Sequence, residues 1–379
     1  MHPLTGVFFV TRSPTVPSPT TAPDTTAPPP VAAPDTAATR RMLLGPMVIG
    51  LFLVLAFAGL MIPALQDPQP HDVPIGVVGP AGTGDKIDQQ LQAGSPDAFD
   101  VTSYRSEGAA RDALMDHEIY GALLFTAPQE PPTLLVAGAA GDAPVRVVTA
   151  AYEELTRQAG ATGEIQDVAP LPESDSRGVS GLLLSIALVI GALLFQAVLS
   201  LMAARLPARK RFLAGLGYAV IAGGVGALLA GPVIGAFDGS FPQLFGVAVL
   251  LSLAVIGVVA ACQGLLGVLG VAVGALVVLP LGVSSSGGPV DYHFLPDFYS
   301  TISQYMPMGS AITSLRRIFY FDGNNVMTPL LTLAVWVAVA WIIALVAERV
   351  RPFRPAVLVV PVSELPPGYL PDRRAGRAS

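Results

Sequence analysis

A run of 52 residues from Gly239 to Val290 contains no charged side chain. A helix needs about 20 apolar residues to cross the hydrocarbon core of a bilayer, so this run is too long for one crossing. We divide it near Ala261–Gly264 into two helices joined by a tight hairpin. Only 13% of the whole chain is charged, which is about half the share found in soluble domains. The sequence therefore predicts a membrane protein.

Six uncharged segments have the length of a membrane span. They are residues 42–65, 179–204, 212–237, 244–262, 264–283 and 323–347. In one alternative the first segment is a cleaved signal peptide, although it is long for that role and follows a long leader. In a second alternative, a single span and an interfacial stretch replace the hairpin. The number of crossings then becomes odd instead of even.

Basic residues beside the spans predict the orientation, because Lys and Arg gather at the cytoplasmic ends of membrane helices. Three basic clusters fall on one side of a six-span chain: Arg40 with Arg41, the loop 205–211, and Arg349, Arg351 and Arg354. This places both termini in the cytoplasm. The N-terminal tail, residues 1–39, is rich in Pro, Thr and Ala and is predicted to be disordered, and the C-terminal tail comprises residues 348–379. We expect an α-helical polytopic protein of the cell membrane, with a small α/β extracytoplasmic domain, residues 66–178, between helices 1 and 2.

The external segment begins with glycines that are typical of a phosphate-binding loop, in VPIGVVGPAGTGDKID (Val73–Asp88). That loop requires a Ser or Thr directly after its lysine, whereas Ile87 follows Lys86 and the carboxylate of Asp85 precedes it. We therefore predict no nucleotide site. The stretch is interpreted as a strand (Val73–Val78), a glycine turn and a helix from Asp85, and FDVTSY (Phe99–Tyr104) as a second strand.

The predicted spans contain no ionisable residue, although proton- and ion-coupled transporters usually hold such residues in the membrane. Gln196 and Gln263 are the notably polar residues there, and Gln196 either bonds a neighbouring helix or lines a path. Gly270 and Gly274 belong to a series of glycines whose spacing predicts close helix packing. Energy for any transport would come from outside the spans, for instance from a separate ATPase, because the chain has no Walker motif.

No group of residues has the spacing of a catalytic or metal site. His117 lies between Asp116 and Glu118 and is interpreted as a solvated helix end. We therefore expect no enzyme activity, no cofactor and no nucleic-acid partner.

Residues 284–322 are the most distinctive part of the chain. Met308, Ile312, Leu315 and Phe319 fall on one face of a predicted helix, which indicates an amphipathic helix at the membrane interface or a re-entrant segment. Backbone at membrane depth needs cover from protein or a water-filled cavity, so Ser284–Gly288 is predicted to line a cavity mouth.

The chain resembles the ABC-2 type permeases, especially the phage-infection-protein (Pip) branch, in its order of one span, an external domain and five spans. The similarity rests on Leu281-Gly282, Ser285 to Gly288, FLPDFY (Phe294–Tyr299), YMPMGSAI (Tyr305–Ile312) and SLRR (Ser314–Arg317). The branch has Asn-Pro where Val283 and Ser284 stand here, so a role for that asparagine does not carry over.

The resemblance covers roughly residues 40–350 and implies the permease subunit of an exporter. It implies a homodimer or heterodimer of permease subunits and a separate ABC ATPase as partner. It also implies an ATPase-coupling loop with Arg205, Arg209, Lys210 and Arg211, for which a topology signal alone is the alternative. The candidate external gate consists of Ser285, Ser286, Gly287, Gly288, Pro307 and Arg316.

An alternative function also stays open. Pip-like proteins include non-transporting scaffolds and receptors, such as phage receptors and secretion-system accessories, which present an external domain. The sequence does not identify a substrate.

Overall fold

The structure is a computed structural model that describes residues 36–66, 68–125, 131–160, 162–202, 206–237, 239–288 and 290–350. The chain divides into a short unit, Met1–Val48, and a main unit, Ile49–Ser379. Most of the two predicted tails lies outside the described residues. The helices extend into both predicted tails. Helix α1 (Thr36–Leu65) begins at Thr36, inside the predicted tail 1–39, and α12 (Met327–Val350) continues to Val350, inside the predicted tail 348–379.

Four described helices have the length and apolar composition to cross a membrane, which indicates a membrane protein. They are α5 (Ser180–Met202), α6 (Ala208–Leu228) with its π-helical extension η3 (Leu229–Val233), α7 (Phe241–Leu266) and α12. Two shorter apolar helical segments are Gly50–Leu65 in α1 and Leu269–Ser284, which covers α8 (Val268–Val278) and α9 (Pro280–Ser284).

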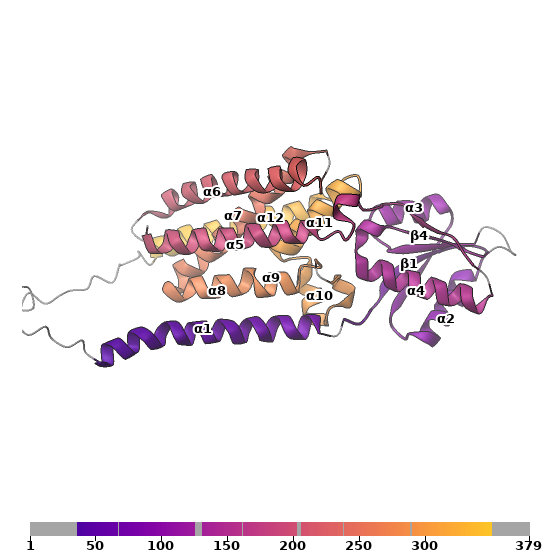
Figure 1. Cartoon of the computed structure of the whole chain (residues 1–379), viewed down its shortest axis with the longest axis horizontal. Helices are drawn as coiled ribbons and strands as arrows, with labels where there is room; N and C mark the ends of the chain where they lie inside the picture. Colours follow the sequence, from indigo (N-terminus) through magenta and orange to yellow (C-terminus); the bar gives the residue numbers. More distant parts are fainter. Residues whose placement is uncertain are drawn as a thin grey trace, which may run out of the picture. The chain divides into compact units, whose positions relative to one another are not determined.

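Helix α7 is the centre of the helical bundle. It packs against α5, α6, α8 and α12, which run alongside it in Figure 1. Most residues of α7 are buried, whereas only 28% of the residues in the spanning windows of α5, α6 and α12 are buried. Exposed Leu, Ile and Val side chains on these outer helices suit contact with lipid.

The turn between α7 and α8 lies further along the chain than the sequence predicts. The predicted break at Ala261–Gly264 falls inside α7, which continues to Leu266 and ends at Gly267 with a φ of 66°. Glycine adopts this left-handed conformation without steric cost. The polar Gln263 therefore does not mark a loop, because its side chain is bonded inside the bundle.

A five-stranded sheet with the order β2-β1-β3-β4-β5 forms the second part of the main unit. Its strands are β1 (Val73–Val78), β2 (Phe99–Tyr104), β3 (Gly121–Leu124), β4 (Thr133–Val136) and β5 (Ile165–Asp167). Only the β3–β4 pair is antiparallel among these described strands. The strands predicted at Val73–Val78 and Phe99–Tyr104 are confirmed.

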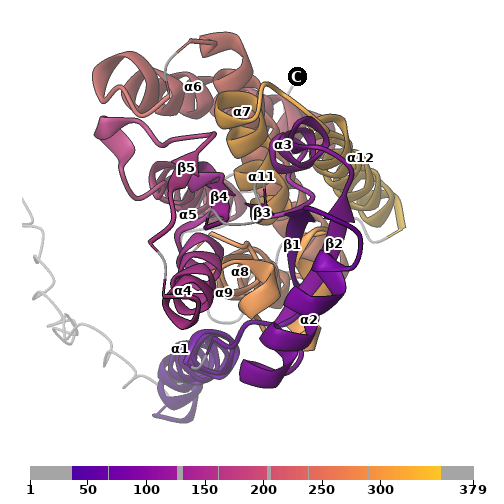
Figure 2. The same cartoon turned by 90° about the vertical axis from the view of Figure 1, so that its right-hand side faces the viewer.

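Three helices cover the sheet, as Figure 2 shows: α2 (Thr83–Gly94) and α4 (Asp142–Gln158) on one face and α3 (Glu107–Met115) on the other. Gly84 in the first turn of α2 serves packing, because a Cβ there would lie only 2.2 Å from the Ser103 hydroxyl oxygen of β2. Short 3-10 turns η1 (Gly138–Ala140) and η2 (Glu173–Asp175) precede α4 and α5.

The segment between α9 and α12 joins the sheet to the bundle. It contains η4 (Tyr292–Phe294), α10 (Asp297–Ser303) and α11 (Pro307–Tyr320). Phe294 and Phe321 from this segment are buried in the hydrophobic core of the sheet domain. Met308, Ile312 and Leu315 of α11 are instead buried in the core of the helical bundle. The predicted amphipathic helix is thus present, and its apolar face packs on protein.

Candidate functional site

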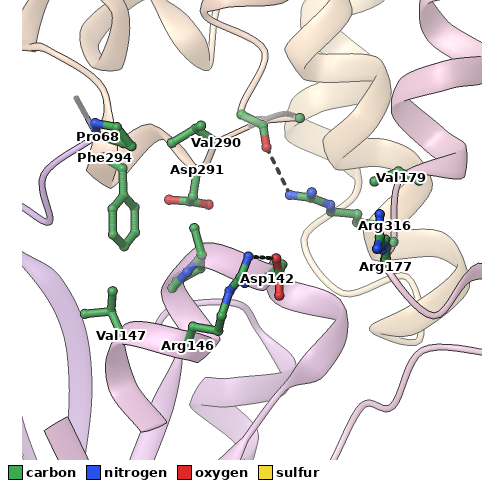
Figure 3. A pocket seen from close by; sticks show the side chains of 16 residues that line it. Pro68, Asp142, Arg146, Val147, Arg177, Val179, Val290, Asp291, Phe294 and Arg316 are labelled. Atoms are coloured by element: carbon green, nitrogen blue, oxygen red, sulfur yellow. Dashed lines mark hydrogen bonds and ion pairs between the residues drawn. The ribbon is translucent and has the colours of Figure 1, made fainter. Parts of the chain in front are cut away.

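A cavity of about 820 Å³ lies where α4 of the sheet domain, the start of α5 and the α9–α11 segment meet. Figure 3 shows that its charged lining side chains come from separate parts of the chain. They are Asp142 and Arg146 of α4, Arg177 before α5, Asp291 before η4, and Arg316 of α11. We call this space the arginine cavity.

Arg316 connects the two parts of the main unit. One of its guanidinium nitrogens donates to the carbonyl oxygen of Gly287 at 3.3 Å and lies 3.5 Å from that of Ala140. Gly287 follows α9, whereas Ala140 belongs to the sheet domain. The planar, permanently charged guanidinium suits such a bridging position.

The charges around the arginine cavity are only partly neutralised. Arg146 forms an exposed ion pair with Asp142 one helical turn away. Arg177 and Arg316 form no ion pair with any described residue. Guanidinium groups bind carboxylate and phosphate oxygens through paired, charge-assisted hydrogen bonds. The cavity therefore offers two guanidiniums to an anionic group.

Asp291 lines this cavity and is fixed by hydrogen bonds to other residues. The Tyr120 hydroxyl donates to its Oδ2 at 2.9 Å, and the backbone N–H of His293 donates to its Oδ1 at 3.1 Å. The ring Nδ1 of His293 lies 3.0 Å from the same Oδ1. Burial favours a higher pKa for Asp291, but the hydrogen bonds and charge of His293 outweigh it and hold the pKa below its usual range. Asp291 is therefore a buried carboxylate that joins the sheet domain to the α9–α11 segment.

A smaller polar cavity of about 220 Å³ shares part of its lining with the arginine cavity. Gly287, Asp291 and Arg316 line both cavities, and His117 and Arg317 line only the smaller one. The two spaces therefore share a wall that contains the guanidinium of Arg316.

His117 is not the solvated helix end that its acidic neighbours indicate. Its ring stacks on Phe321 with centroids 5.1 Å apart, and its buried Nε2 has no hydrogen-bond partner among the described residues. Burial is the main reason that the pKa of His117 falls to about 4. The imidazole is therefore neutral at pH 7, and the charged groups that act on it come from residues 291–317 rather than from Asp116 and Glu118 beside it.

The six residues of the predicted external gate have different structural roles. Gly287, Gly288 and Arg316 line the arginine cavity. Ser285 and Ser286 are buried and donate their hydroxyls to the carbonyls of Leu281 and Val283, at the end of α9. Pro307 begins α11, where a residue without an N–H fits the first helical turn.

The four residues of the predicted ATPase-coupling loop do not have the same surroundings. Arg205 lies outside the described residues. Arg209 and Lys210 are exposed at the start of α6, whereas Arg211 turns inward and donates to the side-chain oxygen of Gln263 at 2.5 Å.

Gln196 of α5 is fully buried and its side chain faces α7. Its amide nitrogen lies 3.4 Å from the Gln263 oxygen, which also accepts from the Ser200 hydroxyl at 2.7 Å. Of the two roles predicted for Gln196, these contacts fit the bond to a neighbouring helix.

Several residues of the site are absent from the sequence-based prediction. Arg146, Arg177 and Asp291 are ordinary charged residues in their local sequence context, and they meet only through the fold. Asp291 carries one signal, since it ends the long uncharged run. A carboxylate at a predicted membrane boundary is a sequence signal for a functional residue.

Fold and site together define a helical membrane protein with a five-stranded α/β sheet and an arginine-lined cavity between them. Comparisons with family models, curated proteins and solved structures found no match.

Proposed function

We propose that this chain is the membrane-spanning permease subunit of an ABC-2 type exporter, energised by a separate ATPase. In this proposal it crosses the cell membrane six times, with both termini in the cytoplasm and the sheet domain outside. It works as a dimer with a second permease subunit. The observation that carries the proposal is the contact between the sheet domain and the α9–α11 segment.

This contact limits the number of crossings. Tyr120 of the sheet domain bonds Asp291 at 2.9 Å, so both residues lie on one side of the membrane. Helices α5, α6 and α7 cross between them, and three crossings would leave Asp291 on the opposite side. A fourth crossing is needed, and α8 with α9 is the apolar segment available for it.

The length of α8 and α9 is compatible with this role. Leu269–Ser284 extends about 24 Å at 1.5 Å per helical residue. The hydrocarbon core is about 30 Å thick, and a short span is accommodated by local thinning at modest cost. With α12 after it and α1 before the sheet domain, the total becomes six.

The start of α6 provides a surface for the ATPase. Arg209 and Lys210 are exposed there, close to the predicted cytoplasmic boundary. The neighbouring N–H of Ala208 donates to the carboxylate of Glu348 at 2.7 Å, near the end of α12. A partner that moved the start of α6 would therefore act directly on α12 as well.

We expect Arg209→Glu to abolish copurification of the ATPase in mild detergent while membrane insertion stays normal. The reversed charge meets acidic groups on the partner, whereas the other cations of the cluster still keep the loop inside. Lys86→Glu, at an exposed cation of the sheet domain away from this surface, is the charge-matched control and should retain the partner. Mass spectrometry of the purified complex measures both.

Full partner binding by Arg209→Glu would leave the cluster as a topology signal only. If the wild-type protein purifies with no ATPase, the permease proposal fails and a scaffold or receptor role takes its place.

A further inference from the structure

We infer that the arginine cavity binds the headgroup of an anionic lipid whose acyl chain lies in an apolar furrow between α5 and α6. This inference names the substrate class of the proposed permease and in that respect rests on the proposed function. It is carried by two hollows of opposite chemical character whose linings include consecutive residues at the beginning of α5.

The headgroup end has the required charge. Arg177 and Arg316 face the cavity without an ion pair among the described residues, whereas the nearby Asp142 is paired with Arg146. Asp291 also lines the cavity, but it accepts hydrogen bonds from Tyr120 and His293. Arg316 uses one guanidinium nitrogen for the carbonyls of Gly287 and Ala140, and its remaining N–H groups together with Arg177 would position a phosphate by charge-assisted hydrogen bonds.

The cavity is too large and too apolar for a simple ion. Its volume of about 820 Å³ falls in the range of sites for whole organic ligands. Val147, Val179, Val290 and Phe294 line it together with the charged groups. A glycerol backbone and the first part of an acyl chain suit this mixed lining.

The apolar furrow has a volume of about 430 Å³. Its lining includes Leu183, Ala187 and Leu188 of α5 and Ile221, Ala222 and Val225 of α6. Leu183 and Ile221 are among the exposed large hydrophobic side chains of the bundle. An apolar groove on a membrane-facing surface is filled by acyl chains, because no water is present there.

The linings of the two hollows include consecutive residues at the beginning of α5. Arg177, Gly178 and Val179 line the arginine cavity, and the next residue, Ser180, lines the furrow. From Ser180 to Leu188 the furrow follows α5 for about 12 Å. One amphiphile can therefore place its charge in the cavity and its chain in the furrow.

The test is thermal unfolding of the purified full-length protein in a neutral detergent, with three added probes. Dioctanoyl phosphatidylglycerol carries the charge and the chains, dioctanoyl phosphatidylcholine carries the chains without net charge, and glycerol phosphate carries the charge alone. We expect a saturable rise in melting temperature with phosphatidylglycerol, and at least tenfold weaker effects from the other two probes.

Variants assign the effect to the two hollows. Arg177→Gln and Arg316→Gln should each raise the half-saturating concentration of phosphatidylglycerol about tenfold or more. Arg157→Gln, on α4 outside the cavity, should leave it unchanged. Ala187→Phe fills the furrow and should weaken binding, whereas Ala334→Phe, on the exposed face of α12, should not. Because Arg177 is exposed, its variant keeps the test valid even if Arg316→Gln lowers stability.

Other outcomes would overturn the inference. Equal shifts with phosphatidylcholine would remove the role of the arginines. An equal, Arg316-dependent shift with glycerol phosphate would identify a site for a soluble anion instead of a lipid. Lipid binding without a copurifying ATPase would support the lipid site and reject the permease proposal. A copurifying ATPase without lipid binding would support the permease proposal and reject the lipid site.

Discussion

A Gly270→Ala variant is expected to melt far below the wild-type protein and to accumulate poorly in the membrane. A Cβ at this position in α8 would lie 2.1 Å from the carbonyl oxygen of Cys262 and 2.4 Å from the backbone nitrogen of Gln263. These are backbone atoms of α7, so no side chain can rotate away and the two helices must separate. Overpacking typically costs about 1–3 kcal/mol and more where the backbone must move, so we expect a loss of at least about 3 kcal/mol.

The matched control is Gly246→Ala in α7. Nothing lies within 4 Å of a Cβ at Gly246, and alanine favours a helix by about 1 kcal/mol over glycine. This variant should therefore melt at or slightly above the wild-type temperature. Thermal unfolding in detergent compares both variants, and equal melting temperatures would show that α8 does not pack on α7 as described.

Asp291→Ala should produce the second large effect, a loss of about 3–5 kcal/mol and release of the sheet domain from the α9–α11 segment. The change removes the acceptor for the Tyr120 hydroxyl and for the N–H of His293, both in a buried region. Breaking a buried charged network leaves its remaining members without partners, which accounts for this magnitude. The freed domain should be cut by protease much faster than in the wild-type protein.

Asp297→Ala provides the comparison for this prediction. Asp297 lies in the first turn of α10 and is exposed, so its loss should cost less than about 1 kcal/mol. Limited proteolysis and thermal unfolding of both variants are the measurements. Similar protease resistance in Asp291→Ala and Asp297→Ala would contradict a joining role for Asp291.

Hydropathy and alternation were sufficient to predict much of the fold. The long apolar helices follow from the length of the uncharged runs, and strands β1 and β2 follow from Val73–Val78 and Phe99–Tyr104. The turn after α7 could not be predicted, because Gln263 is polar for a reason of tertiary structure. It accepts hydrogen bonds from Ser200 and Arg211 on neighbouring helices.

The site was predicted less completely than the fold. The family resemblance places Gly287, Gly288 and Arg316 in one candidate gate, and all three line the arginine cavity. Arg146 and Arg177 gave no local signal, because a charged residue in an amphipathic helix or a loop is usually solvated. His117 illustrates the same limit, since its contact with Phe321 spans more than half of the chain.

The proposed arrangement depends on the sheet domain and the α9–α11 segment lying outside the cell. Cys262 is the only cysteine, so Cys262→Ala provides a background for single cysteines at Ser95, Thr301 and Ser379. Ser95 in the sheet domain and Thr301 in α10 are exposed, and Ser379 ends the chain. An impermeant thiol reagent applied to intact cells should label the cysteines at Ser95 and Thr301, and should label the one at Ser379 only after permeabilisation. Labelling at Ser379 in intact cells, or protection of either external position, would contradict the six-span permease.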